Sequence, residues 1–262
     1  MTSFLLNYQG NKWNESKYLK DLDYSSYDTI IEPFGGSFGF SRYLHEKLKL
    51  KDKKYIIYDN NKELIDFYNY IKELIHEDTF NDFLDQYNNI AEKLIEQFTT
   101  GHGGQRRNQV KKKECEEYIL NEESIPIYIK YILLHNLLSC HISRVYMKKN
   151  IGFQELFKSS EFIHCNFEDL DFKIYNKEKT LIYLDPPYIL EHNDYYKSVD
   201  ESFSYYEKLI NLFETNICLF IHSYLGLLDF VFRKYKYMNY GKLYQNHNNQ
   251  KIHIVYYNPK IE

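Results

Sequence analysis

The amino-acid sequence predicts an α/β protein, with helices on both faces of a parallel sheet and a mainly helical insertion in the middle of the chain. Two short apolar runs early in the 262 residues are each followed by a helical pattern, which is the order of a βαβα unit. A long stretch of helical pattern comes next, and apolar runs of strand length resume after residue 160. One sheet interrupted by a helical insertion explains all three observations.

The predicted elements follow one another along the chain as this fold requires. The first βαβα unit has strands over residues 28–32 and 55–59 and helices over residues 40–50 and 62–75. Residues 79 to about 139 are helical in pattern, apart from segment 99–113, which holds three glycines and five basic residues and no acid. Further strands are predicted over residues 162–165, 180–185, 217–222 and 251–258. The sheet domain is therefore expected over 1–78 and 160–262, and the insertion over 79–159.

Composition excludes several classes of protein. Hydrophobic residues at 44% and charged residues at 27% are typical of a soluble globular protein rather than a disordered or fibrous one. The net charge of −4 excludes a protein that is basic overall, although a local basic patch can still meet phosphates. The four cysteines are widely spaced without a CxxC pair, so we expect neither a zinc site nor another metal, and no disulfide framework.

The chain shows no targeting or membrane signal. Its N-terminal apolar run is too short for a signal peptide, and no uncharged apolar stretch approaches the ~18 residues of a membrane span. We expect the protein in the cytoplasm of a bacterium or, if it is viral, of its host. Aromatic residues reach 18%, which a bias toward A/T-rich codons explains, so only individual aromatic side chains are considered as functional.

A glycine-rich turn, Glu-Pro-Phe-Gly-Gly-Ser-Phe-Gly over residues 32–39, follows the first predicted strand. At the carboxyl edge of a parallel sheet such a turn brings backbone N–H groups close to a ligand. Asp59 closes the second strand, and an acid about 20 residues after the glycines is typical of ribose binding. A tight turn followed by a helix-capping aspartate explains the same residues. Nucleoside binding and this plain structural role both stand at this point.

The most specific motif is Asp185-Pro186-Pro187-Tyr188, directly after a buried strand. Two prolines cannot continue a central strand, so the four residues form a stiff turn at the carboxyl edge of the sheet. The turn combines an anionic acceptor, a backbone carbonyl and an aromatic ring. An exocyclic amino group on a nucleobase needs two acceptors for its hydrogens and a ring on which the base stacks outside the duplex.

With these motifs in order, the sequence resembles the Dam-type (alpha-class) DNA adenine-N6 methyltransferases, which use S-adenosylmethionine. The resemblance covers most of the chain and rests on the segments Tyr8-Gln9-Gly10-Asn11-Lys12, Glu32-Pro33-Phe34-Gly35-Gly36, Asp59-Asn60-Asn61-Lys62-Glu63-Leu64-Ile65, Asn166-Phe167 and Asp185-Pro186-Pro187-Tyr188. It implies a Rossmann-like methyltransferase sheet as the catalytic domain and a target-recognition insertion with a β-hairpin. The implied reaction is site-specific methylation of adenine N6 in a short, GATC-like duplex site.

The resemblance also assigns roles to residues. The implied cofactor contacts are Tyr8 and Lys12 near the N-terminus, Glu32, Phe34, Gly35 and Gly36 at the methionine end, Asp59 at the ribose, Asn166 and Phe167 at the adenine, and Asp185. Asn166 stands where the family usually has aspartate, and Phe38 stands where many relatives have glycine. The implied catalytic residues are Asp185, Pro186, Pro187 and Tyr188, with the Asp185 carboxylate and Pro186 carbonyl accepting the amino hydrogens and Tyr188 stacking on the flipped adenine. No metal and no general base is required.

The expected partner is double-stranded DNA, bound by a monomer or a weak dimer. Segment 105–113 carries Arg106, Arg107 and Lys111, which suit phosphates or base edges, although a charge run can also be a solvated loop. Residues 139–153, with Arg144, Lys148 and Lys149, resemble the hairpin that enters the duplex beside the target base.

Two other functions compete with this one. The chain could methylate another planar amine, such as cytosine N4, an RNA base or a protein glutamine, although such enzymes often carry Ser-Pro-Pro or Asn-Pro-Pro and lack this insertion. It could also be a DNA-binding protein that has kept the fold without activity, an alternative that Asn166 and Phe38 keep in consideration.

Overall fold

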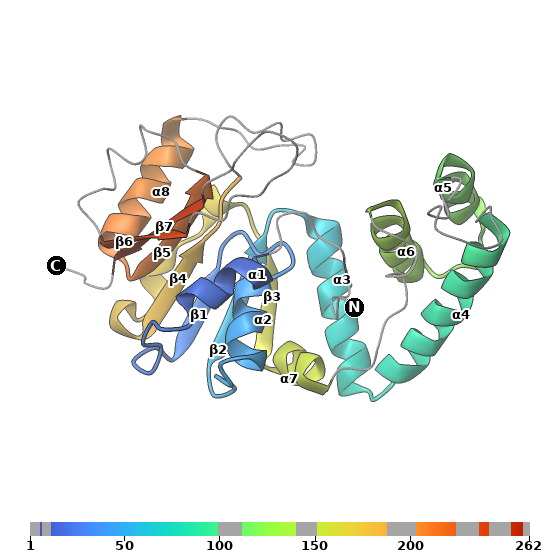
Figure 1. Cartoon of the computed structure of the whole chain (residues 1–262), viewed down its shortest axis with the longest axis horizontal. Coiled ribbons are helices and arrows are strands. Elements are labelled where there is room, and N and C mark those ends of the chain that lie inside the picture. Colours follow the sequence, from blue (N-terminus) through green and yellow to red (C-terminus); the bar gives the residue numbers. More distant parts are fainter. Residues whose placement is uncertain are drawn as a thin grey trace. The chain divides into compact units, whose positions relative to one another are not determined.

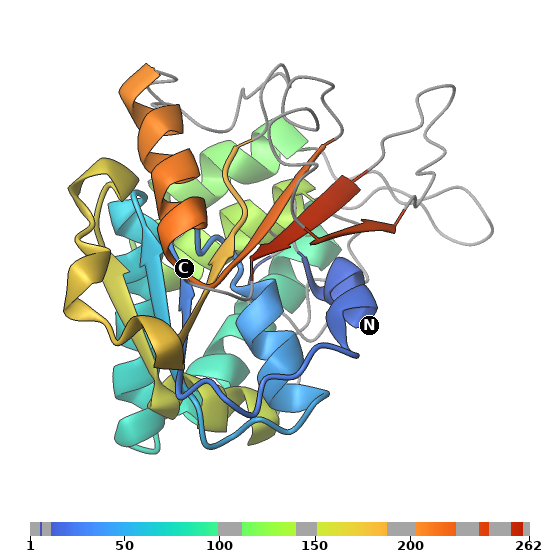
Figure 2. The ribbon, with the colours of Figure 1, turned by 90° about the vertical axis from the view of Figure 1, so that its left-hand side faces the viewer.

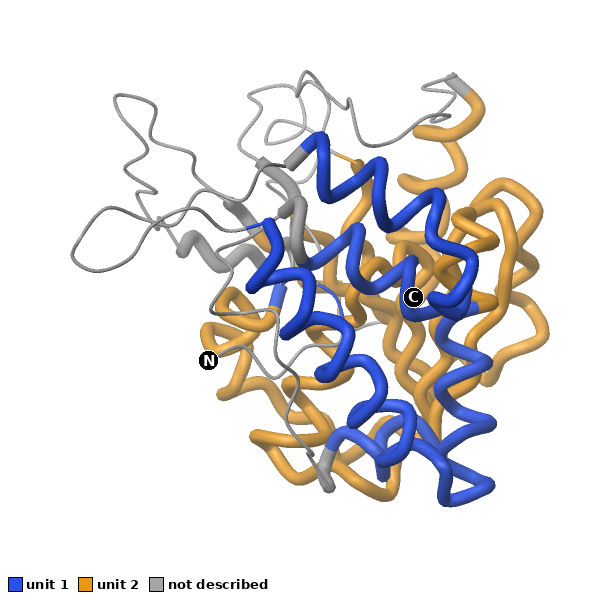
Figure 3. Tube along the Cα trace, turned by 90° about the vertical axis from the view of Figure 1, so that its right-hand side faces the viewer, with its two compact units in different colours: residues 1–12, 67–158 blue, residues 13–66, 159–262 orange. Residues whose placement is uncertain are grey.

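The computed structural model describes residue 6 and residues 12–98, 112–139, 151–187, 203–223, 236–240 and 253–258 (Figure 1). The chain forms two compact units, which Figure 3 distinguishes by colour. One comprises residues 1–12 and 67–158, and the other residues 13–66 and 159–262. Among the described residues no helix is long and apolar enough to cross a membrane.

The second unit is built on a seven-stranded mixed sheet (Figures 1 and 2). Its strands are β1 (Thr29–Glu32), β2 (Lys54–Asp59), β3 (Ser160–His164), β4 (Thr180–Leu184), β5 (Cys218–Ser223), β6 (Lys236–Tyr240) and β7 (His253–Asn258), in the order β3-β2-β1-β4-β5-β7-β6. The first five strands pair in parallel, as the βαβα pattern predicts. β7 runs antiparallel to β5 and β6, and the sequence does not predict β6.

Helices cover both faces of this sheet. On one face Phe40 of α2 (Gly39–Glu46) stacks on Tyr183 of β4, with ring centroids 4.1 Å apart. On the other, Ile182 and Leu184 of the same strand belong to a buried cluster with Phe213 of α8 (Phe203–Thr215). Neighbouring strand residues point to opposite faces, so β4 is apolar throughout and buried on both sides.

Short elements complete this unit. They are α1 (Trp13–Ser16), the start of α3 (Lys62–His76), and the 3-10 helices η1 (Lys17–Leu19), η3 (Phe167–Asp169), η4 (Phe172–Ile174) and η5 (Lys177–Lys179). α2 is shorter than the predicted helix 40–50, which is a correction to the sequence analysis. Lys49 adopts a left-handed conformation with φ 62°, so the chain leaves the helix before Leu50.

The described part of the first unit is helical, as expected for the insertion. It holds the rest of α3, α4 (Phe80–Phe98), α5 (Lys112–Asn121), α6 (Ile127–Ser139) and α7 (Ile151–Ser159). Aromatic rings join these helices, as where Phe153 of α7 stacks near Phe80 of α4 with centroids 6.1 Å apart. Ser139 ends α6 and residues 151–153 begin α7, so the ends of the expected hairpin segment are helical; residues 140–150 lie outside the described residues.

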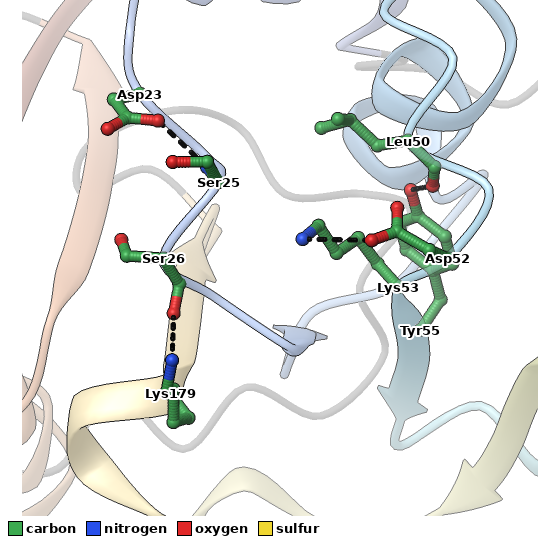
Figure 4. A network of polar contacts seen from close by, with 8 residues as sticks. All are labelled: Asp23, Ser25, Ser26, Leu50, Asp52, Lys53, Tyr55 and Lys179. Carbon is green, nitrogen blue, oxygen red and sulfur yellow. Dashed lines mark hydrogen bonds and ion pairs between the residues drawn. The ribbon is translucent and has the colours of Figure 1, made fainter.

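Polar contacts stabilise the turns at the amino ends of the strands (Figure 4). Before β2, the Tyr55 hydroxyl donates to the Leu50 carbonyl at 2.6 Å, and Lys53 pairs with Asp52 at 3.3 Å. Before β1 and β4, the Lys179 ammonium donates to the Ser26 carbonyl at 3.3 Å. These groups close the connections between elements.

Candidate functional site

The strand order places a ligand site at the carboxyl ends of β1 and β4. From β1 the chain continues to β2 on one side, while β4 lies on its other side, so the strand order reverses between β1 and β4. In open α/β sheets ligands bind outside the carboxyl ends of the strands at such a point. Residues singled out by the sequence lie at or just after the ends of four neighbouring strands: Glu32 and Asp59 end β1 and β2, Asp185 directly follows β4, and Asn166 lies two residues after β3.

The glycine turn after β1 packs directly against the end of β2. The Gly35 N–H donates to the Tyr58 carbonyl at 2.7 Å. A Cβ atom on Gly35 would lie 2.3 Å from Cγ2 of Ile57 and 3.0 Å from the Tyr58 carbonyl oxygen, so a larger residue would have to displace the Ile57 side chain. Gly36 has φ 46°, in the left-handed region that favours glycine. Close packing against Ile57 and Tyr58 thus favours glycine at position 35, and the left-handed backbone favours it at position 36.

Asp59 ties this turn to the end of β2. One carboxylate oxygen accepts from the Gly36 N–H and the other from the Asn61 N–H, each at 2.8 Å. Burial raises the pKa of Asp59, while the backbone N–H groups of Asn61 and Gly36 and the charge of His164 act in the opposite direction. Each carboxylate oxygen has two lone pairs, so the anchored group can still accept from a ligand hydroxyl.

Glu32 has a contact that the sequence analysis did not anticipate. It is only 3% exposed, and its Oε1 accepts from the Ser41 N–H at 2.7 Å, in the first turn of α2. A carboxylate at a helix N-terminus satisfies a backbone donor and interacts favourably with the helix dipole. Glu32 thus stabilises α2 as well as lying at the end of β1.

Phe38, which stands where relatives have glycine, adopts the backbone conformation that glycine favours. Its φ of 40° and ψ of 43° are left-handed, at the N-cap residue directly before α2. That conformation costs a non-glycine residue roughly 1–2 kcal/mol. The side chain is buried and its ring packs edge-on against Phe162 of β3 at 5.5 Å. Burial of the ring offsets the backbone strain.

Three aromatic rings gather beside the turn. Phe167 of η3 lies 4.8 Å from Phe34 and 5.4 Å from Tyr205 of α8, measured between ring centroids. Phe34 and Phe167 are both among the expected cofactor residues. Tyr205 was missed, because its segment reads only as an amphipathic helix with no local signal of a site.

Asn166 is held by a neighbour in the same turn. Its Nδ2 donates to Oδ2 of Asp169 at 3.2 Å, and the Asp169 N–H donates to the Asn166 carbonyl at 3.0 Å. With its amide nitrogen engaged in this way, the side chain presents its oxygen as an acceptor.

The Asp185 motif begins where β4 ends. The strand is buried along its whole length, Pro186 is buried, and Asp185 and Pro187 are partly exposed. The prolines cannot donate to a sheet ladder, so the chain leaves the sheet at Asp185. The carboxyl group is thus placed at the edge where the glycine turn lies.

The other expected site residues belong to the first unit or lie outside the described residues. Lys12 is buried, but it belongs to the first unit, whereas the residues above belong to the second. The following lie outside the described residues: Tyr8, Arg106, Arg107, Lys111, Arg144, Lys148, Lys149 and Tyr188. Within the described ranges no three His, Cys, Asp or Glu side chains are grouped so that they could hold a metal ion.

Comparison with known proteins identifies the family of this chain. No curated protein matches the chain. A family model described as D12 class N6 adenine-specific DNA methyltransferase matches residues 8–154, more than half of the 262 residues. The match includes the glycine turn and Asp59 and ends before Asp185. The family acts on DNA with S-adenosylmethionine as methyl donor. The chain belongs to the D12 class N6 adenine-specific DNA methyltransferases.

Proposed function

We propose that this chain is a site-specific DNA methyltransferase that transfers a methyl group from S-adenosylmethionine to the N6 amine of an adenine flipped out of duplex DNA. The observation that carries the proposal is the position of Asp185-Pro186-Pro187. These residues follow β4 at the switch point, next to the glycine turn of β1, and they lie outside the part of the chain that the family model matches.

The residues around the turn fit the chemistry of S-adenosylmethionine. A carboxylate suits its ammonium group, and Glu32 lies at the end of β1. Asp59, fixed by two backbone N–H groups, suits the ribose hydroxyls. The Asn166 oxygen suits the adenine amine, and Phe34 and Phe167 offer apolar faces to the ring. Tyr8, Lys12, Gly35 and Gly36 are proposed as further contacts.

Asp185 and Pro186 are proposed to act on the target base. S-adenosylmethionine, when bound, supplies a methyl group that is already strongly electrophilic. The Asp185 carboxylate and the Pro186 carbonyl would accept the two amino hydrogens of adenine, which favours a tetrahedral nitrogen and turns its lone pair out of the ring system. Tyr188 would stack on the flipped base, and Pro187 stiffens the turn. Positioning then supplies most of the remaining rate enhancement.

DNA recognition is assigned to the insertion. We propose residues 1–78 and 160–262 as the catalytic domain and 79–159 as the target-recognition region. Its basic residues, Arg106, Arg107, Lys111, Arg144, Lys148 and Lys149, would contact phosphates and base edges.

A methyl-transfer assay with product analysis tests the proposal. Purified protein is incubated with duplex DNA and methyl-labelled S-adenosylmethionine, and the DNA is digested to nucleosides. We expect the label in N6-methyl-2′-deoxyadenosine, and none in a control duplex of poly(dG)·poly(dC). Label in N4-methyl-2′-deoxycytidine, or transfer to an RNA duplex supplied in a parallel reaction and none to DNA, would mean that the enzyme methylates a different amine. Binding of S-adenosylhomocysteine and DNA without any methyl transfer would favour the non-catalytic alternative.

A further inference from the structure

Lys208 of α8 reaches the segment that follows β3. Its Nζ donates to the backbone carbonyl oxygens of Glu168 and Leu170, the latter at 2.8 Å. The ammonium also lies 5.5 Å from the ring centroid of Phe167. Lys208, about 40 positions later in the chain, therefore contacts Phe167, Glu168 and Leu170.

The turn is also held by the side-chain bond from Asn166 to Asp169, by a bond from Ser204 to the Glu168 carboxylate and by the ring contacts of Phe167. Its internal bonds run from the Asp169 N–H to the Asn166 carbonyl at 3.0 Å and from the Leu170 N–H to the Phe167 carbonyl at 3.3 Å. A single 3-10 turn of this kind has poorer hydrogen-bond geometry than an α-helix. Its last carbonyl groups need partners, and hydrogen bonds from a charged donor are the stronger kind.

The surroundings of Lys208 act on its charge in two directions, and burial is the larger effect, so the pKa of Lys208 lies below its ordinary value. Burial lowers the pKa of Lys208, whereas Asp169, Cys165, Glu168 and Asp171 raise it. The acidic residues of the turn thus favour the ammonium form that the two carbonyl groups require.

We propose that Lys208 is a positioning residue for the adenine side of the cofactor site. By bonding the Glu168 and Leu170 carbonyls and covering the Phe167 ring, it holds Asn166 and Phe167 in the arrangement that receives the adenine. It therefore sets cofactor affinity and leaves the chemical step unchanged. The inference rests on the proposed function, because it concerns the same cofactor site.

Lys177 provides a matched control. Its Nζ also donates to a backbone carbonyl of α8, that of Thr215, at 3.4 Å. This contact lies at the C-terminal end of the helix and touches none of Asn166, Phe167 or Leu170. A Lys177→Met variant thus removes a similar lysine–carbonyl bond without loosening the proposed site.

Affinity measurements on four proteins test the inference: wild type, Lys208→Met, Lys208→Arg and Lys177→Met. For Lys208→Met we expect the calorimetric Kd for S-adenosylhomocysteine and the KM for S-adenosylmethionine to rise about tenfold, as when only ~10% of molecules hold the competent arrangement. Its kcat should stay within about twofold. Lys208→Arg should recover most of the affinity, because arginine can also donate to both carbonyls. Lys177→Met should match wild type.

A second readout needs no cofactor. In the ligand-free protein, Lys208→Met should speed hydrogen exchange at the Asp169 and Leu170 amides, and Lys177→Met should not. An unchanged Kd in a folded Lys208→Met, an equal loss in Lys177→Met, or a fall in kcat at unchanged Kd would overturn the inference. Wild-type protein that fails to bind S-adenosylhomocysteine would instead overturn the proposed function, and the inference with it.

Discussion

The two edges of the sheet in the second unit differ in what their polar groups contact. At the amino edge, Tyr55 and Lys179 donate to backbone carbonyls of the adjoining connections, so their role is to stabilise turns. At the carboxyl edge, Asp59 joins the ends of β1 and β2, while Asn166 and Asp185 stand at the ends of β3 and β4. The same apolar strands support both edges. Strand direction thus brings the residues of the proposed site to the carboxyl edge, while the carboxylates at the amino edge, such as Asp23 and Asp52, contact neighbouring turn residues.

The largest expected effect is that of Asp185→Ala on methyl transfer. Loss of a group that stabilises the reacting centre typically lowers kcat by about 100-fold or more. We expect at least this loss, with unchanged folding, in the labelled-methyl assay. Asp28→Ala is the matched control, because Asp28 is exposed and directly precedes β1 at the amino edge. Near-normal turnover in folded Asp185→Ala protein would contradict the proposed catalytic role.

Asp59→Asn should weaken cofactor binding by about tenfold or more, because it removes a charged acceptor from hydrogen bonds. In wild type the affinity for S-adenosylhomocysteine should fall on acidification, starting above the ordinary pKa of 3.8, because burial raises the pKa of Asp59 and protonation removes the charge. In the variant that pH dependence should disappear.

The raised pKa of Asp59 makes the stability of the fold change with pH in the opposite direction to cofactor affinity. Since the folded-state pKa of Asp59 is raised, its contribution to stability is full below pH 3.8 and is lost as the pH rises through the folded-state value. Denaturant titrations of wild type and Asp59→Asn across that range should show this loss in wild type alone. Asp52→Asn, at the amino edge, should leave the affinity for S-adenosylhomocysteine and the pH dependence of stability as in wild type. Equal weakening of cofactor binding by Asp52→Asn would mean that the two edges do not differ in function.

Tyr55→Phe should have the smallest effect. It deletes the hydroxyl that bonds the Leu50 carbonyl, which lowers the free energy of unfolding by about 1 kcal/mol. Denaturant titration should detect this loss, and kcat/KM should remain at the wild-type value. A clear fall in kcat/KM at full folding would mean that the amino edge also contributes to catalysis.

The central strands were predictable because they are apolar on both faces. β1, β2 and β4 read as continuous β-branched and aromatic runs, and their parallel pairing follows from the intervening helix pattern. β6 was not predictable, since Lys236 and Asn239 interrupt its apolar pattern at the outer edge of the sheet. The early end of α2 goes with the left-handed conformation of Lys49, and no local sequence motif predicts that conformation.

Only those site residues whose place follows from their position at the end of a predicted strand could be predicted from the sequence. Glu32, Asp59 and Asp185 could be placed at strand ends, because a parallel sheet brings those ends to one edge. The bond from the Gly36 N–H to Asp59 and the anchoring of Ser41 by Glu32 depend on the path of the backbone. Contacts of Tyr205 and Lys208 with Phe167 join residues about 40 positions apart, so they follow from packing rather than from any local pattern.

Amide hydrogen exchange with and without S-adenosylhomocysteine tests most directly that function resides at the carboxyl edge. The cofactor product should slow exchange at the amides of Gly36 and Asn61, which bond Asp59, and at Asp169. Exchange at Ser25 and Lys54, at the amino edge, should not change. Protection at the amino edge, or bound ligand without protection at Gly36 and Asn61, would contradict the account.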